Sequence, residues 1–221
     1  MVTEAGQESA HTYRSPLREQ QAAATRLRVL AAASERFGEY GYSGSTLRDI
    51  ARAAGVSLDT VQAQGTKAEL FLAAFDLALV GEDQALPLRE QPAPDLREAF
   101  AASTLEGVMR PGCRFLADGN RRSAALWRAF IGAAAGEEQL AEAYAAKMRA
   151  MRAEGVSGMR LLISRGLIDE PADIQRLADE LWMTGHPAQY DLLVLHAGWS
   201  EEHYLTWLTE NMIATVRRHC G

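Results

Sequence analysis

The residues from Arg26 to Phe75 alternate amphipathic segments with single glycines, a pattern that few folds accommodate. At the start of this stretch, small and apolar residues recur every three or four positions, at Leu27, Leu30, Ala31, Ser34 and Phe37. This spacing predicts a helix with one buried stripe. Gly41 follows and can end that helix as a left-handed C-cap.

A second amphipathic segment begins shortly afterwards, where Ser45 or Thr46 can serve as the N-cap. Its expected buried side consists of Leu47, Ile50, Ala51 and Ala54. Gly55 permits a sharp turn, and Val56 and Val61 add apolar positions to the short helix that follows. Because none of these short helices could bury its apolar residues alone, the three are predicted to pack as one compact unit.

Thr66 and Glu69 form a capping-box signature, which predicts the start of a further helix. The apolar side of that helix contains Leu70, Phe71, Ala74, Leu77 and Ala78. We therefore expect three regions along the chain. A loose polar arm covers residues 1–19, the three-helix unit covers 20–66, and a second domain that opens with this helix covers 67–221.

The second domain is also predicted to be helical, because it lacks the sustained alternation of apolar and polar residues that marks strands. Breakers are expected at residues 87–94 and 111–112 and at Pro171, Pro187 and Gly198. One face of a long helix should carry Leu140, Tyr144, Met148, Met151, Gly155, Met159 and Leu162, and the helix before it Trp127, Phe130, Ile131 and Ala134. The whole chain is therefore predicted to be all-α.

Charge is distributed unevenly over the 221 residues, whose formal net charge is −6. Between Ala10 and Lys67, eight Lys and Arg residues stand against five Asp and Glu, a balance of +3; from Ala68 onward, fifteen stand against twenty-two, a balance of −7. Only the first domain therefore suits a polyanion such as a nucleic acid. Because no apolar run reaches membrane-spanning length and the first twenty residues are too polar for a signal peptide, we expect a cytoplasmic protein.

The ordered features of this first stretch resemble the DNA-binding domain of tetracycline-repressor-like (TetR-family) transcriptional regulators. They are the helix ending in Phe37, the Gly41-Tyr42 pair, Thr46, Asp49-Ile50-Ala51, Ala54-Gly55-Val56-Ser57, Thr60 and Lys67. A second, softer resemblance, to the dimerisation end of some members, covers Leu181 to Leu208. The resemblance implies an N-terminal three-helix helix-turn-helix domain and a C-terminal helical domain for effector binding and dimerisation. Such a protein would be a repressor that a small molecule releases from a palindromic operator.

In such regulators a recognition helix enters the major groove, and helix N-termini with nearby polar groups hold phosphates. The recognition helix here would be Ser57 to Gln62. The resemblance implies DNA contacts from Thr46, Ser57, Leu58, Asp59, Thr60, Gln62 and Lys67. Thr46 would lie at a phosphate and Lys67 at the DNA backbone. Asp59 also suits a helix N-terminus, and this stabilising role is favoured over a contact with cytosine.

The segment QAQGTK, residues 62–67, departs from the family pattern. The family usually has a tyrosine at position 62 and another aromatic residue a few positions later, and the segment here is one residue shorter. Gln62 and Gln64 can pair with adenine or simply be solvated, but neither supplies a ring. We therefore expect DNA binding to depend more on phosphate and polar contacts than it does in relatives with these aromatics.

The resemblance also implies an apolar or amphipathic effector and a homodimer. The effector is expected between the helices that carry Phe100, Met109, Trp127, Phe130, Tyr144 and Met148, because methionine conforms to irregular ligands. The dimer is expected to form a four-helix bundle from residues Asp173 to His186 and Ser200 to Arg218 of each chain, with Leu181 and Leu208 in the seam.

Two other classes of function remain open. The altered QAQGTK segment is compatible with a dimeric small-molecule sensor or scaffold that binds no operator. An all-α enzyme is less favoured, because the sequence offers no nucleophile with its base and no glycine-rich phosphate loop. His186, His196 and His203 lack metal-ligand spacing, and Cys113 and Cys220 form no CxxC pair. Neither a metal nor a cofactor is therefore expected.

Overall fold

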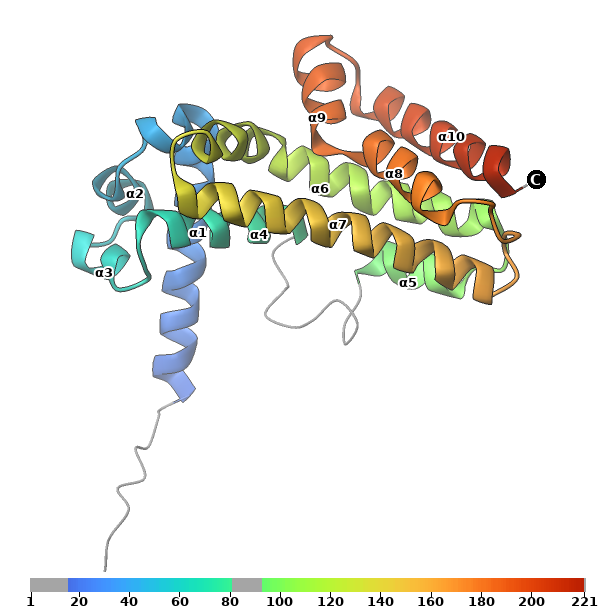
Figure 1. The fold of residues 1–221 in the computed structure, drawn as a ribbon. Coiled ribbons are helices and arrows are strands. Elements are labelled where there is room, and N and C mark those ends of the chain that lie inside the picture. Colours follow the sequence, from blue (N-terminus) through green and yellow to red (C-terminus); the bar gives the residue numbers. More distant parts are fainter. Residues whose placement is uncertain (1–15, 81–92, 221) are drawn as a thin grey trace, which may run out of the picture.

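The computed structural model describes residues 16–80 and 93–220, and every regular element in these two ranges is a helix (Figure 1). The elements are α1 (Pro16–Gly44), α2 (Leu47–Ala54), α3 (Leu58–Gln62), α4 (Lys67–Val80), α5 (Pro94–Ala101), α6 (Leu105–Ala134), α7 (Glu138–Ser164), α8 (Ile174–Gly185), α9 (Pro187–Tyr190), the π-helical η1 (Asp191–His196) and α10 (Glu201–Cys220). The predicted all-α fold is confirmed. No helix within these ranges is both long and apolar enough to cross a membrane.

The first helix begins earlier than expected and buries a stripe that agrees only in part with the predicted one. It starts at Pro16, inside the segment assigned to the arm, because proline has no N–H to lose at a first helical position. Residues 1–15 lie outside the described part of the chain. Leu27 is 47% exposed and Ala31 is also exposed, whereas Val29 and Ala33 are fully buried. Leu30 and Phe37 are buried as predicted, so the prediction of the buried stripe is right at these positions and wrong at Leu27 and Ala31.

Gly41 interrupts α1 rather than capping it. Its φ of 71° is positive, as expected, but its ψ of 173° lies outside the left-handed helical region, and one further turn follows. The Ser45 hydroxyl lies 2.9 Å from the carbonyl oxygen of Arg36 and 2.8 Å from that of Gly41, so it can donate to either. Because Ser45 is occupied in this way, Thr46 is the residue that caps α2.

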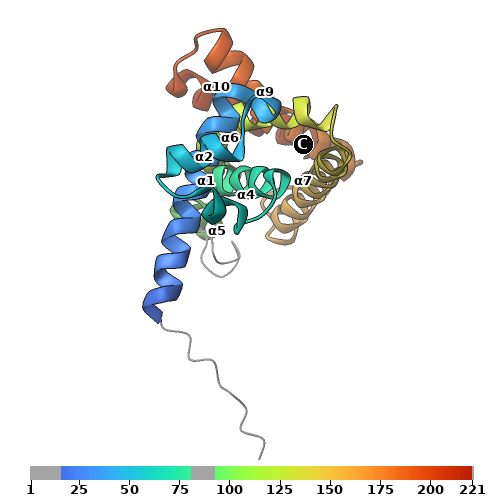
Figure 2. The same cartoon turned by 90° about the vertical axis from the view of Figure 1, so that its left-hand side faces the viewer.

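One aromatic cluster joins the N-terminal helices to the rest of the molecule. Phe71 of α4 packs edge-on against Phe37 and Tyr42 of the α1 region and against Phe130 of α6, with ring centroids 5.1 to 5.6 Å apart. Phe75 of α4 continues the cluster to Phe130 and Trp127, and Trp127 and Phe130 both contact Tyr144 of α7. The end-on view of Figure 2 shows α4 lying between α1 and α7. Both domains therefore share a single core at their junction.

Helix α6 runs through a position where a breaker was expected. Pro111 lies inside the helix, so the prediction of a break at 111–112 is wrong. Proline removes the helical hydrogen bond to the carbonyl of Gly107, but α6 continues on both sides of it. Three other predicted breakers do separate helices, since Pro171 precedes α8, Pro187 starts α9, and Gly198 has a φ of 73° before α10. Most of the remaining predicted breaker, 87–94, lies outside the described residues.

A second core holds α8 and α10 against the N-terminal half of α6 and the C-terminal half of α7. Leu181 and Leu208 are buried in this core, so the expectation that they form an intermolecular seam is wrong. Glu180 of α8 bonds His219 at 3.1 Å and Arg218 at 2.6 Å on α10. The hydrogen bonds from His219 and Arg218 hold the pKa of the Glu180 carboxyl at about 2. Within one chain, α8 and α10 are therefore already partners.

Candidate nucleic-acid interface

Helices α2 and α3 form a tight helix-turn-helix at the end of the molecule far from the C-terminus (Figure 1). Gly55 makes the turn with φ 64° and ψ 38°, a conformation in which a side chain would be strained. The backbone N–H of Val56 reaches back to the carbonyl of Ala51 at 3.0 Å, and Gly55 donates to Arg52. Ile50 and Ala51 are the buried residues of α2, so its opposite side faces solvent.

Helix α3 is five residues long and presents a polar N-terminal end. Ser57 is its N-cap and accepts a hydrogen bond from the Thr60 N–H at 3.1 Å, while the two hydroxyls lie 2.8 Å apart. Val61 is fully buried, Leu58 and Thr60 are half-buried, and Ser57, Asp59 and Gln62 are exposed. The predicted base-reading residues are thus brought together on one short helix that is anchored by a single valine.

Thr46 is engaged in a local cap that reduces its freedom. Its hydroxyl accepts from the Asp49 N–H at 3.2 Å and donates to the Asp49 carboxylate at 2.6 Å. That hydrogen bond lowers the pKa of Asp49, whose carboxylate also lies 3.3 Å from Arg52. The Thr46 hydroxyl could bind a phosphate only by giving up Asp49. The other donors that this site offers to an anion are the exposed N–H groups at the start of α2.

The unusual QAQGTK segment forms a closed turn whose geometry depends on glycine. Gly65 has a φ of 135°, and a β-carbon there would lie 2.8 Å from a Glu69 carboxylate oxygen. That carboxylate accepts from the Thr66 N–H at 2.8 Å, and Thr66 accepts from the Glu69 N–H at 3.2 Å, which confirms the predicted capping box. A side chain at position 65 would therefore be strained by the backbone and would have to displace the Glu69 carboxylate from its cap.

The QAQGTK turn is bonded to α1, a contact that the sequence did not predict. Arg26 of α1 donates to the side-chain oxygen of Gln64 at 3.3 Å, so Gln64 is tied to α1 and is not simply solvated. The two residues are 38 positions apart, and no periodic signal in the sequence links them. This bond joins the α3–α4 turn to the first helix.

Lys67 lies on the ring of Tyr42. Its ammonium nitrogen is 4.2 Å from the ring centroid, a cation–π distance, and partial burial lowers the pKa of this lysine. The Gly41-Tyr42 pair and Lys67 belong to the same predicted motif, and the structure brings them into contact. The side chain of Lys67, at the start of α4, is therefore held on the Tyr42 ring and does not move freely.

The six residues predicted to line an effector site lie in three places. Trp127, Phe130, Tyr144 and Met148 pack together in the first core, between α4, α6 and α7. Met109 packs against the second core, and Phe100 on α5 is 53% exposed. Four of the six are therefore neighbours, whereas Phe100 and Met109 are separated from them.

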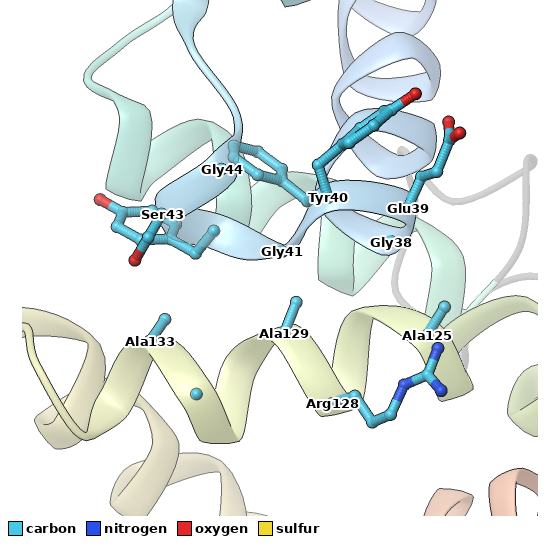
Figure 3. A pocket seen from close by; sticks show the side chains of 13 residues that line it. Gly38, Glu39, Tyr40, Gly41, Ser43, Gly44, Ala125, Arg128, Ala129 and Ala133 are labelled. Carbon is cyan, nitrogen blue, oxygen red and sulfur yellow. The ribbon is translucent and has the colours of Figure 1, made fainter.

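A different hollow lies between the two domains. A groove with a volume of about 390 Å³ lies between the end of α1, from Phe37 to Gly44, and α6. Figure 3 shows the two helices that form its walls. Its α6 side is small and apolar, with Ala125, Ala129 and Ala133, and Arg128 lies at its edge. Arg128 is paired with Asp191 of η1 at 3.3 Å. The tightest approach is at Gly38, where a β-carbon would lie 3.3 Å from that of Ala125.

Comparison with known proteins assigns the N-terminal helices to a family. Residues 29–74 match the family described as bacterial regulatory proteins, tetR family. An uncharacterized HTH-type transcriptional regulator of Bacillus subtilis (strain 168), YezE, is 37% identical over 81 residues. That alignment covers 36% of this chain and 42% of the relative, so it spans less than half of either protein.

Solved structures extend the similarity in fold to most of the chain. A candidate TetR-family transcriptional regulator from Mesorhizobium loti MAFF303099 has a TM-score of 0.68 at 22% identity, covering 91% of this chain and 99% of that one. A TetR transcription regulator from Haloarcula marismortui ATCC 43049 has a TM-score of 0.65 at 15% identity, covering 90% and 100%. At these identities the likeness concerns the fold of both domains.

Proposed function

The chain belongs to the TetR family of bacterial regulatory proteins, and from this premise we propose that it is a repressor that binds a palindromic operator as a homodimer and leaves it when a small molecule binds. The observation that carries the proposal is the arrangement of α2, the Gly55 turn and α3. This arrangement exposes Ser57 and Asp59 at the N-terminal end of α3 and Gln62 at its C-terminal end, where side chains can reach base edges in a major groove.

The charge of the domain supports the same proposal. The N-terminal part from Ala10 to Lys67 carries a surplus of basic residues, whereas the remainder of the chain is acidic. A protein that coated nucleic acid with its whole surface would not show this division. We propose that the N-terminal domain contacts DNA and that Thr46, Ser57, Leu58, Asp59, Thr60, Gln62 and Lys67 supply the contacts.

Selection of bound fragments from a random duplex library tests the proposal directly. We expect a two-fold symmetric consensus with half-sites about one helical turn, ~34 to 36 Å, apart. Thr60→Ala or Gln62→Ala should then change base preference by about 1 to 3 kcal/mol at one position of each half-site. Asp59→Asn should leave the preference unchanged if Asp59 only stabilises α3. If no consensus emerges from the wild-type protein, a sensor without an operator becomes the better description.

The regulatory half of the proposal rests on α6 and α7. Trp127, Phe130, Tyr144 and Met148 form a cluster that lies directly beside Phe75 of α4, the helix that begins at Lys67. A ligand that inserts here would have to move α4 or α7. Because α4 follows the recognition helix, such a shift would change the position of α3 and favour a state that does not match the operator.

The proposed dimer uses the surface of α8, η1 and α10. Large apolar side chains exposed at this end are Met183, Leu192 and Leu195, each about half exposed. A groove of about 600 Å³ lies between α8 and α10, lined at its edges by charged residues including Arg176 and Asp179. Apolar side chains beside a polar groove are typical of an interface that has an apolar centre and a polar rim.

Met183→Arg is expected to weaken the homodimer by about 2 kcal/mol or more, because a methionine side chain loses its apolar contact and a charge enters the interface. Analytical ultracentrifugation over a concentration series measures the effect. Ile131→Arg is the matched control, since Ile131 is also about half exposed but lies on α6. An unchanged dimer in the Met183 variant, or equal loss in both variants, would place the interface on another surface.

A further inference from the structure

Two buried indole N–H groups have no hydrogen-bond acceptor among the described residues. They belong to Trp127 of α6 and Trp182 of α8. Trp127 is only 1% exposed, and the nitrogen of Trp182 is buried although part of its ring is not. Leaving a buried donor without a partner costs about 1 to 3 kcal/mol, so such groups are uncommon in folded proteins.

His186 contacts both indoles and supplies a third donor. Its ring centroid is 4.7 Å from that of Trp127 and 5.3 Å from that of Trp182, and it is nearly perpendicular to both rings. The Nδ1 atom accepts a hydrogen bond from the Ala188 N–H at 3.1 Å, so the neutral ring carries its proton on Nε2. Burial lowers the pKa of His186, which favours this neutral form. The three side chains thus offer N–H donors and only one acceptor, which is already used.

The residues around these three donors favour a ligand whose hydrogen-bond acceptor carries no charge. No lysine or arginine is among the buried residues described, and burying an unpaired anion would be costly. Lys147 does contact the same aromatic cluster, 5.9 Å from the Phe75 ring centroid, but it is paired with Asp76 at 2.6 Å. A carbonyl or ether oxygen accepts hydrogen bonds without bringing a charge and is therefore the group that fits.

The surroundings can also adapt to a ligand. Trp182 and His186 are only partly buried at the C-terminal end of α8, so the site can be approached from that side. Met148 and Met151 of α7 are partly buried against the same core. Their unbranched side chains can change rotamer to accommodate an apolar body beside Trp127 and Tyr144.

We propose that Trp127, Trp182 and His186 form the polar end of the effector site and that the effector is an uncharged, mainly apolar molecule bearing a carbonyl-type acceptor. The inference rests on the proposed regulatory function and adds the chemical class of the ligand. The two indole N–H groups bind the acceptor oxygen, and the rings of Phe75, Phe130 and Tyr144 surround the apolar part.

Three small molecules of similar size test whether the site recognises a neutral acceptor oxygen or binds apolar molecules by contact alone. Acetophenone carries a neutral acceptor, ethylbenzene carries none, and benzoate carries a charged one. In ¹H–¹⁵N spectra of the full chain, which has four tryptophans, acetophenone should shift the indole signals of Trp127 and Trp182 but not those of Trp199 and Trp207. We expect acetophenone to bind at least about tenfold more tightly than either other probe.

Matched variants identify the donors. Trp127→Phe and Trp182→Phe each remove one N–H while keeping an aromatic ring, and both should reduce the preference for acetophenone over ethylbenzene several-fold. Trp207→Phe, on α10, should leave that preference unchanged. If Trp127→Phe does not fold, Trp182→Phe alone decides the assignment.

The remaining outcomes each count against the proposal. Equal binding of acetophenone and ethylbenzene would exclude an acceptor site, tighter binding of benzoate would exclude a neutral ligand, and unmoved indole signals would exclude this location. None of these results affects operator binding, which is measured separately by fluorescence anisotropy. A failure of the ligand assignment is therefore distinguishable from a failure of the proposed DNA-binding function.

Discussion

Replacing Phe71 with alanine is expected to lower the free energy of unfolding by about 3 to 5 kcal/mol. Phe71 is fully buried and contacts the rings of Phe37, Tyr42 and Phe130 edge-on. The variant loses the burial of one large ring and three aromatic contacts, and it leaves a cavity at the point where the two domains meet. Urea denaturation followed by circular dichroism measures the change.

Phe100→Ala is the matched control for this prediction. Phe100 has the same side chain but is 53% exposed on α5, so its replacement should change the free energy of unfolding by about 0.5 kcal/mol or less. Similar effects in both variants would mean that the aromatic cluster does not hold the domains together. Two separate unfolding transitions in the Phe71 variant would show in addition that the N-terminal domain had come loose from α6.

Replacing Lys67 with alanine is expected to weaken DNA binding about equally for all sequences and to reduce the salt dependence of affinity. One lost phosphate contact should lower the slope of log affinity against log salt concentration by about one. The expected cost is larger than that for a mobile surface lysine, because Lys67 is held 4.2 Å from the Tyr42 ring centroid and loses little conformational entropy on binding. Fluorescence anisotropy on the selected operator over a salt series measures the slope.

Lys147→Ala is a well-matched control, since Lys67 and Lys147 are the only lysines in the chain. Lys147 is paired with Asp76 at 2.6 Å on the side of α7, away from α3, so its loss should leave the slope unchanged. An unchanged slope in the Lys67 variant would contradict the assigned backbone contact. A changed base preference would instead mean that Lys67 reads sequence.

Local features of this fold were predictable because they depend on neighbouring residues. A cap at Ser45 or Thr46, the Gly55 turn and the Thr66–Glu69 capping box were all expected, and each is made by residues within a few positions of one another. The all-α class followed from the absence of strand patterns. Helical periodicity likewise placed Leu140, Met159 and Leu162 on the buried side of α7.

Features that depend on which helix packs against which could not be read from the sequence. Leu181 and Leu208 have the spacing of interface residues, but α6 and α7 of the same chain cover them. Leu27 fits a helical stripe as well as Val29 does, and only the position of α4 and α6 decides which is buried. In the candidate effector site, Trp182 and His186 were missed because the site depends on the contact of His186 with Trp127, which joins residues more than fifty positions apart.

The interlocked rings at the domain junction limit how the N-terminal domain can move. Rings that meet edge-on at 73° to 85°, as Phe71 meets Phe37, Tyr42 and Phe130, cannot slide past one another without first separating. We therefore expect the domain to change position by passing from one ring packing to another, and not by a gradual tilt of α4 against α6. Any signal that crosses this junction would then act as a step between discrete states, so that intermediate ligand concentrations produce mixtures of two populations instead of half-shifted molecules.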